Sequence, residues 1–184
     1  MRSLWLLLLV LASGAAAQPV IDFGLPLSAQ TIQRYAISVY PDGRNLPVGQ
    51  GSVLAGGELY ADRCASCHGA KGKEGPAARL VGSDGFFSFD DPLRILRISE
   101  HPLLLLSVGA QWPYATSIFD YTRRAMPHHA PKSLSDDQVY AVTAYILHLN
   151  DLLDETAVLD QNSLPKVEML GRKRLRWAQG TVQP

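Results

Sequence analysis

The most reactive side chains of this chain lie in one short run, Cys64-Ala65-Ser66-Cys67-His68, which holds its only two cysteines. Each of two thiols at this spacing can add across a vinyl group of a haem, and a histidine directly after them can bind the iron as its proximal ligand. The C-x-x-C-H pattern is typical of covalent haem c attachment. We therefore expect one haem c bonded to Cys64 and Cys67, with His68 on the iron.

Other uses of a cysteine pair agree less well with the rest of the sequence. A structural zinc site needs four ligands, and there is no second cysteine pair to complete one. A thioredoxin-like dithiol would need no histidine after the second cysteine and would lie near a βαβ pattern, which is missing here. A disulfide between Cys64 and Cys67 would close too short a loop to stabilise the fold much.

The first residues of the chain are typical of an export signal. Arg2 precedes an apolar run that begins at Leu4, and small residues continue up to Ala17. We expect residues 1–17 to be a signal peptide cleaved before Gln18. An uncleaved membrane anchor is the alternative, although the apolar run is short for a membrane span. Export agrees with haem attachment outside the reducing cytoplasm, so we expect a periplasmic protein with no later transmembrane span.

The charges are unevenly distributed although the formal net charge is zero. Residues 166–176 contain five basic residues and one acidic residue, whereas residues 18–165 contain 11 basic and 16 acidic residues. A mildly acidic body with a basic tail suggests a docking surface for a protein rather than a nucleic-acid-binding surface. A solvated chain end is the alternative for the last residues.

Two long helices are expected to position the haem motif. Helical spacing runs from Val53 to Arg63, which puts the haem cysteines at the end of a helix, and the glycine-rich residues 69–75 then form a loop close to the porphyrin. The sequence Ser135-Asp136-Asp137-Gln138 is typical of a helix N-terminus, and the apolar stripe after it predicts the clearest helix of the chain, ending near Asn150.

Shorter elements are predicted between and before these helices. Residues 91–98 and 117–124 could each form a helix, and the second should end at Met126-Pro127. Residues 37–40 are compatible with a brief strand, and Pro41-Asp42-Gly43 is typical of a turn.

These elements predict an all-α fold with one haem domain. We expect this domain over residues 53–152, an extended N-terminal arm over residues 18–52 and a C-terminal extension over residues 153–184. We find no internal repeat, and the expected mature length is normal for one domain.

A six-coordinate haem iron needs a second axial ligand. After loss of Met1 with the signal peptide, the remaining methionines are Met126 and Met169. Met126 precedes a proline in a predicted loop before the last helix, whereas Met169 lies beyond that helix. A lone methionine usually fills a core, but the position of Met126 favours ligation, and thioether ligation raises the reduction potential. Met169 is the weaker alternative.

Other side chains are candidates for the surroundings of the haem. Either His128 or His129 could bind the iron in a bis-histidine site of lower potential, but we expect them at the rim of the pocket. His101 and His148 are expected to be surface or packing residues. Arg79 is a candidate partner for a haem propionate, and a plain surface arginine is the alternative.

The order of C-x-x-C-H, Met-Pro in a loop and an amphipathic last helix resembles class I cytochromes c. The resemblance implies that Gly56 and Tyr60 of the first helix cross the last helix near Tyr145. It also implies that the carbonyl of Pro76 accepts a hydrogen bond from the ring N–H of His68, which would orient the imidazole.

A narrower resemblance covers roughly residues 35–170. It is carried by residues 37–43, 75–82, 112–116, 119–127, 135–145 and 164–167. These segments are similar to the SoxD-type cytochrome c subunit of bacterial sulfite or sulfur dehydrogenases, and the run from Trp112 to Pro127 is much more specific than C-x-x-C-H alone. Some members of that family carry a second haem domain, whereas this chain has a single C-x-x-C-H motif.

The resemblance implies a division of labour between two subunits. A molybdenum-cofactor subunit of the SoxC or sulfite-oxidase type would oxidise the sulfur compound, and this chain would accept the electrons singly and pass them to a downstream cytochrome or oxidase. The chain would then be an electron-transfer subunit without catalytic residues, and its arm and residues 164–167 would wrap the partner. A free-standing shuttle cytochrome is the alternative. A haem enzyme or gas sensor needs an open sixth position, which Met126 argues against.

Overall fold

The computed structural model describes residues 24–82 and 107–174 of the chain. These residues belong to two units, Met1–Tyr35 and Ala36–Pro184. The predicted signal peptide, the predicted helix over residues 91–98 and His101 lie outside the described residues. None of the described helices is long and apolar enough to cross a membrane.

The first unit contains one helix, α1 (Ala29–Tyr35), which the sequence pattern does not predict. It begins after Ser28, whose hydroxyl accepts a hydrogen bond from the backbone N–H of Thr31 at 3.1 Å. Its apolar side chains are exposed, and Tyr35 is 73% accessible to solvent. The prediction that the whole of residues 18–52 is extended is therefore wrong over this helix.

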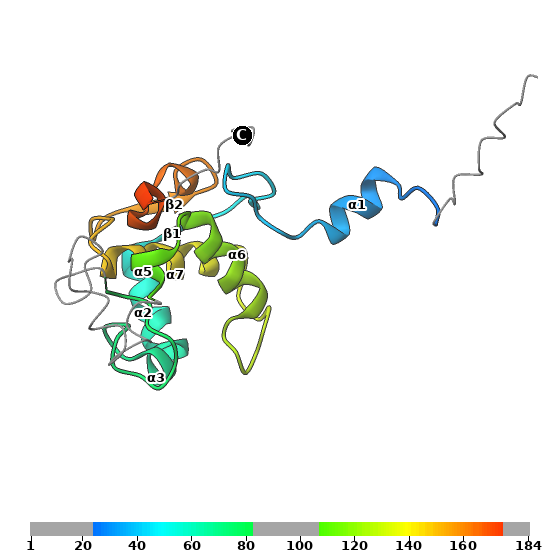
Figure 1. Cartoon of the computed structure of the whole chain (residues 1–184). Helices are drawn as coiled ribbons and strands as arrows, with labels where there is room; N and C mark the ends of the chain where they lie inside the picture. The colour runs from blue at the N-terminus through cyan, green and yellow to red at the C-terminus, as the bar shows by residue number, and fades with distance from the viewer. Residues whose placement is uncertain (1–23, 83–106, 175–184) are drawn as a thin grey trace, which may run out of the picture. The chain divides into compact units, whose positions relative to one another are not determined.

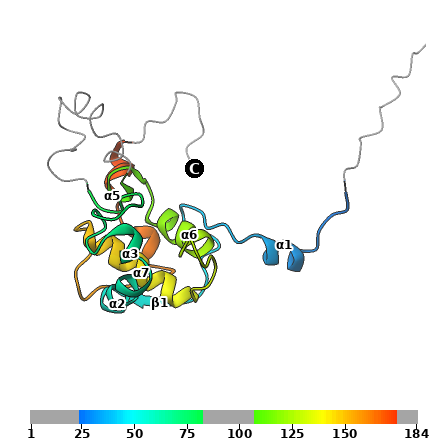
Figure 2. The same cartoon turned by 90° about the horizontal axis from the view of Figure 1, so that it is seen from below.

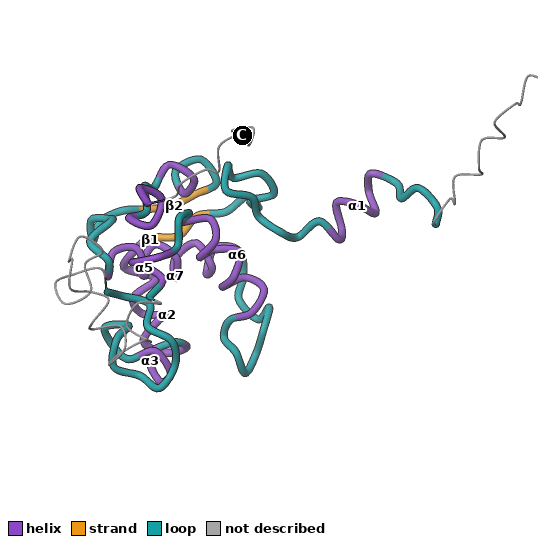
Figure 3. Tube along the Cα trace, viewed as in Figure 1, coloured by secondary structure: helices purple, strands orange, loops and turns teal. Residues whose placement is uncertain are grey.

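The second unit is mainly helical (Figure 1), as Figure 3 shows by secondary structure. In chain order its elements are β1 (Gln50–Ser52), α2 (Val53–Arg63), α3 (Ala65–His68), α5 (Val108–Gln111), α6 (Ala115–Ala125), α7 (Asp136–Leu149), β2 (Val158–Asp160) and the 3-10 helices η3 (Leu164–Lys166) and η4 (Leu170–Arg174). The predicted all-α class is confirmed, with one small sheet added.

The two short strands pair with each other although they are far apart in sequence (Figure 3). β1 and β2 are antiparallel, with Gly51 opposite Leu159. The sequence pattern does not predict either strand, and residues 37–40, where a strand is predicted, have none. The turn predicted after them is confirmed, because the N–H of Gly43 donates to the carbonyl of Tyr40 at 3.0 Å.

The boundaries of α2 and α7 agree with the sequence signals. The Ser52 hydroxyl caps α2 by accepting from the N–H of Ala55 at 3.1 Å. Ser135 and Gln138 form a reciprocal capping box at the start of α7. Both helices therefore carry their own start signals in the sequence.

The start of α6 differs from the prediction. The helix begins at Ala115 instead of Ser117, and its N-cap residue Tyr114 makes no side-chain capping bond. The side chains of Ala115 and Thr116 are buried. Tertiary packing thus extends the helix beyond the local Ser-x-x-Asp signal. The helix ends at Ala125, as the following Met126-Pro127 predicts.

Helices α2 and α7 pack against each other (Figure 2), and the residues at their crossing are those that the class I resemblance implies. A Cβ atom on Gly56 would overlap the backbone carbonyl of Ala141 on α7. One turn further along α2, the ring of Tyr60 lies 5.2 Å from the ring of Tyr145. Glycine at position 56 therefore lets the two backbones approach, and the tyrosine pair fills the space beside the crossing.

The C-terminal segment belongs to the core of this unit. Leu159, Leu164 and Met169 are each at most 2% exposed and pack in the same cluster as the core residues of α2, α6 and α7. Leu164 is therefore not free to contact a partner, which removes the predicted wrapping role of this residue. The described part of the tail therefore completes the core of this unit.

Candidate functional site

The haem-attachment motif lies at the junction of α2 and α3. Cys64 is the C-cap residue of α2, and its carbonyl accepts hydrogen bonds from the N–H groups of Cys67 and His68 at 3.1 and 2.9 Å. This single turn brings both thiols and the imidazole to one side of the backbone, and Gly69 ends it with a φ of +85°. Burial raises the pKa of the Cys64 thiol to about 11, so this sulfur is a neutral thiol at pH 7.

A cavity of about 470 Å³ opens beside this turn. Cys64, Cys67 and His68 line it together with Met126 and the two histidines that follow. The loop after α6 carries Met126 (Figure 1), and it faces the haem motif across this cavity, because residues of both line it. The remaining wall is mainly apolar and comes from Ala77, Ala78, Leu80, Val108, Trp112, Ile118, Tyr121, Thr122, Pro127, Leu134, Val142 and Ile146, with Arg63 added.

The imidazole of His68 has one ring nitrogen engaged by the backbone. Its Nδ1 lies 2.8 Å from the carbonyl oxygen of Ala78, and since a carbonyl only accepts, Nδ1 carries the proton. Nε2 is then the nitrogen left for a metal. The predicted acceptor, Pro76, is wrong: the chain reaches the imidazole two residues later, and Pro76 does not line the cavity.

Met126 is held by the end of α6. Its N–H donates to the carbonyl of Thr122 at 3.0 Å, and its side chain lines the cavity. His128 and His129 are exposed residues of the same wall, as expected for a pocket rim. Met169, the alternative ligand, is fully buried in the core and does not line the cavity.

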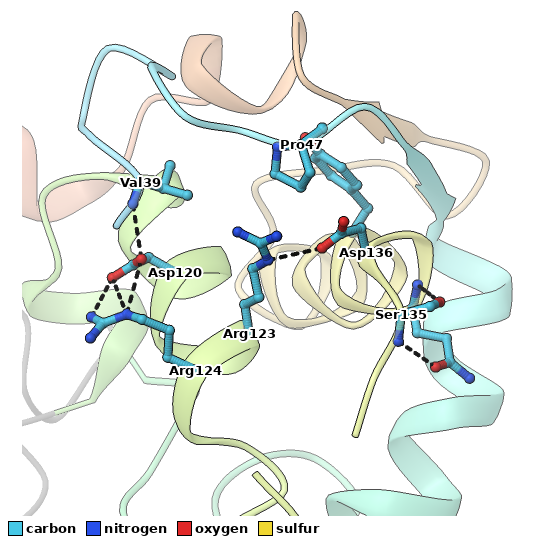
Figure 4. A network of polar contacts seen from close by, with 9 residues as sticks. Val39, Pro47, Asp120, Arg123, Arg124, Ser135 and Asp136 are labelled. Atoms are coloured by element: carbon cyan, nitrogen blue, oxygen red, sulfur yellow. Dashed lines mark hydrogen bonds and ion pairs between the residues drawn. The ribbon is translucent and has the colours of Figure 1, made fainter. Parts of the chain in front are cut away.

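Polar contacts tie α6 to the segment before β1 and to the start of α7 (Figure 4). Arg124 binds Asp120 one turn earlier on α6, with Nη2 2.5 Å from Oδ2. Asp120 also accepts from the N–H of Val39 at 3.0 Å, which ties the helix to the segment before β1. Arg123 pairs with Asp136 at the start of α7 at 2.9 Å.

The other predicted residues lie outside the cavity. Arg79 does not line it, and the arginine that does is Arg63, which pairs with Asp62 at 2.6 Å. Pairing of Arg79 with a propionate stays a prediction. His148 Nδ1 lies 2.9 Å from the carbonyl of Leu153, in agreement with a packing role.

Sequence reasoning missed Ala78, Arg63 and most of the apolar wall. Ala78 acts through its carbonyl, which any residue type would supply, so no side-chain signal marks it. Trp112 and Tyr121, whose rings meet edge to face at 5.7 Å, were part of the family-like segments but carried no predicted role.

The lining residues fit a haem. A volume of this size falls in the range of cofactor pockets, and the mainly apolar wall suits a porphyrin. The two thiols, the free Nε2 of His68 and the Met126 thioether supply attachment and iron ligands together. Within residues 24–82 and 107–174, no cluster of three or more His, Cys, Asp or Glu side chains could hold a bare metal ion.

Comparisons with known proteins agree with this geometry. The chain resembles a crystal structure of the sulfane dehydrogenase SoxCD from Paracoccus pantotrophus with a TM-score of 0.70 and 29% sequence identity, over 86% of this chain and 73% of that chain. A search of curated protein sequences found no match.

Residues 51–146 match the family model described as cytochrome C oxidase, cbb3-type, subunit III. This range is more than half of the chain, and it begins in β1 and ends in α7, so it includes the C-x-x-C-H motif, Met126 and the α2–α7 crossing. Haem c is the cofactor that the family implies. The chain therefore belongs to this family of cytochrome c domains, and its fold is that of a class I cytochrome c resembling SoxD.

Proposed function

We propose that this protein is a periplasmic cytochrome with one haem c that accepts single electrons from a molybdenum-containing sulfite or sulfur dehydrogenase subunit. It passes them to a downstream cytochrome or oxidase in the respiratory chain. The observation that carries the proposal is the resemblance to sulfane dehydrogenase SoxCD, because it extends over 86% of the chain.

The residues of the cavity define how the haem would be held. Cys64 and Cys67 would form the thioether bonds, and His68 and Met126 would bind the iron. When bound, the haem supplies a one-electron redox couple. The Ala78 carbonyl keeps the His68 ring in one orientation. The apolar wall excludes water, and this exclusion favours the uncharged, reduced form of the couple and so raises the potential.

The length of the region that resembles SoxCD indicates which segment contacts the partner. The resemblance covers 86% of the chain, which is more than residues 36–184 alone, so it includes part of the arm that carries α1. A seven-residue helix is marginal by itself in water, and α1 exposes Ile32 and Tyr35. We therefore assign the arm to contact with the molybdenum subunit.

The test is capture of the full chain from a periplasmic extract of its own cells. We expect a co-purifying subunit that contains molybdenum, and haem reduction when sulfite or a sulfane compound is added. A protein that is monomeric, carries haem and brings down no molybdenum would instead be a free-standing shuttle cytochrome. The predicted signal peptide over residues 1–17 is tested by sequencing the mature N-terminus, which should begin at Gln18.

A further inference from the structure

The carbonyl that orients His68 belongs to a short irregular segment, residues 77–82, which we call the proximal segment. On one side it is bonded to the haem-motif loop: the N–H of Ala77 donates to the carbonyl of Cys67 at 2.9 Å, and the N–H of Leu80 donates to the carbonyl of Gly72 at 2.9 Å. A segment without helix or sheet hydrogen bonds needs such contacts to keep one conformation.

On its other side the proximal segment is bonded to α5. The carbonyls of Arg79 and Leu80 accept from the N–H groups of Val108 and Gly109 at 3.2 and 3.1 Å. Next to them, the Ser107 hydroxyl donates to the carbonyl of Gly82 at 2.5 Å. The residues just after Ala78 are thus held by the N-terminal turn of α5.

The side chain of Asn150, at the end of α7, joins these parts. Its Nδ2 donates to the carbonyl of Leu80 at 3.1 Å and to the carbonyl of Ile146 at 2.8 Å, which uses both amide hydrogens. Asn150 is 7% exposed, and its Oδ1 is buried without a hydrogen-bond partner among the described residues. An unpaired buried oxygen lowers the stability of the fold, so any stabilisation by Asn150 comes from the two hydrogen bonds that its amide donates.

Gly109 shows how closely the amide is packed. A Cβ atom at this position would overlap Oδ1 and Cγ of Asn150, so only glycine leaves room for the carboxamide. Gly109 and Asn150 therefore form one contact, in which the backbone of α5 and the side chain from α7 both bind Leu80.

We propose that Asn150 is a positioning residue for the haem: through Leu80 it holds the proximal segment, and so the Ala78 carbonyl, in place to accept the proton of His68 Nδ1. The proposal rests on the proposed function only in taking His68 as an iron ligand. A firm bond from Nδ1 makes an imidazole a stronger donor to its metal. A stronger donor favours the oxidised iron, so the Asn150 contact keeps the reduction potential lower than it would otherwise be.

The test compares reduction potentials of the haem-loaded full chain, measured by redox titration without any partner. Asn150→Ala removes both donated bonds, and Gly109→Ala displaces the amide from the other side while keeping the backbone N–H. We expect both variants to have a higher potential, with the oxidised-to-reduced ratio at a fixed solution potential falling by up to about tenfold. The exchange of the His68 ring proton, followed by NMR, should become faster in both.

The double variant Gly109→Ala/Asn150→Ala distinguishes the loss of one shared contact from two independent disturbances of the fold. With alanine at position 150 the added methyl at position 109 has room, so the double variant should match Asn150→Ala instead of adding the two shifts. Thr143→Val is the control, because Thr143 is also a buried α7 residue and its hydroxyl has no partner among the described residues; its potential should not change.

Different results would contradict the positioning role of Asn150 and the haem site itself. Unchanged potentials in both single variants, or shifts that add in the double variant, would overturn the positioning role of Asn150. Gly109→Ala carries the test if Asn150→Ala does not fold. A wild-type chain that holds no haem at His68 would instead refute the haem site itself.

Discussion

At the scale of single residues, the chemistry depends on which sulfur reaches the iron. Two methionines of the chain are described, and the structure puts them in different environments. Met126 lines the cavity, whereas Met169 is fully buried in the core. A thioether in the cavity wall is placed to act as a ligand, and a thioether in a packed core is placed to fill volume.

Met126→Ala should remove the sixth ligand of the haem iron and leave that position open to an added ligand. Without the thioether, the reduced variant should bind carbon monoxide stoichiometrically at neutral pH, which the wild type should not do without denaturant. Absorption spectra under carbon monoxide measure this. Met169→Leu is the matched control and should leave the iron closed at a cost below about 1.5 kcal/mol in unfolding free energy.

The opposite result would identify another ligand. If Met126→Ala stays closed to carbon monoxide, then His128 or His129, which share the same wall, occupies the sixth position. If the wild type bound carbon monoxide readily, Met126 would not be a ligand of the iron.

At the scale of elements, the decisive contact is the crossing of α2 and α7. The two helices approach at Gly56, and the haem motif begins where α2 ends. A shift in this crossing would therefore move Cys64 and His68 relative to the Met126 loop. The buried hydroxyl of Tyr60 adds to this coupling by donating to the carbonyl of Gly69 at 2.9 Å, just after the motif.

Gly56→Ala should destabilise the protein because the new methyl overlaps the backbone of Ala141. Overpacking of this kind costs about 1–3 kcal/mol, measured by urea denaturation of the haem-loaded chain. Gly57→Ala, on the same helix, meets only the ring of Tyr145 at 3.1 Å. Its gain in helix propensity of about 1 kcal/mol offsets that contact, so its stability should stay near that of the wild type. Equal losses in both variants would contradict a specific backbone crossing.

At the scale of the whole molecule, the large apolar side chains of residues 24–35 are all exposed. Leu25 and Leu27 are 89% and 60% exposed, and the apolar side chains of α1 are exposed as well. The C-terminal segment, by contrast, supplies Leu164 and Met169 to the core. We therefore expect residues 24–35 to contact the proposed molybdenum subunit.

Removal of residues 24–35 should separate partner binding from haem binding. We expect unchanged haem spectra and the loss of most of the co-purifying molybdenum subunit. The variant Ile32→Asp/Tyr35→Asp should act in the same direction without shortening the chain. Leu54→Asp is the control, since Leu54 is an exposed apolar residue of the body at 59% accessibility. Undiminished co-purification after the deletion would show that the arm does not dock.

The sequence alone predicted the haem c cofactor that the family implies and the main helices of this protein. Local signals carry this information: two cysteines and a histidine at fixed spacing, the caps at Ser52 and Ser135, and the methionine before Pro127. Each of these signals acts within a few residues, so it can be interpreted without knowledge of the fold.

The tertiary structure decided what depends on distant contacts. The pairing of β1 with β2, the burial of Leu164 and Met169 and the earlier start of α6 all come from packing between segments far apart in the chain. The acceptor for His68 is Ala78 rather than Pro76. The sequence could not identify it because a backbone carbonyl carries no side-chain signature, and the segment that holds it is bonded through Leu80 to Gly109 and Asn150.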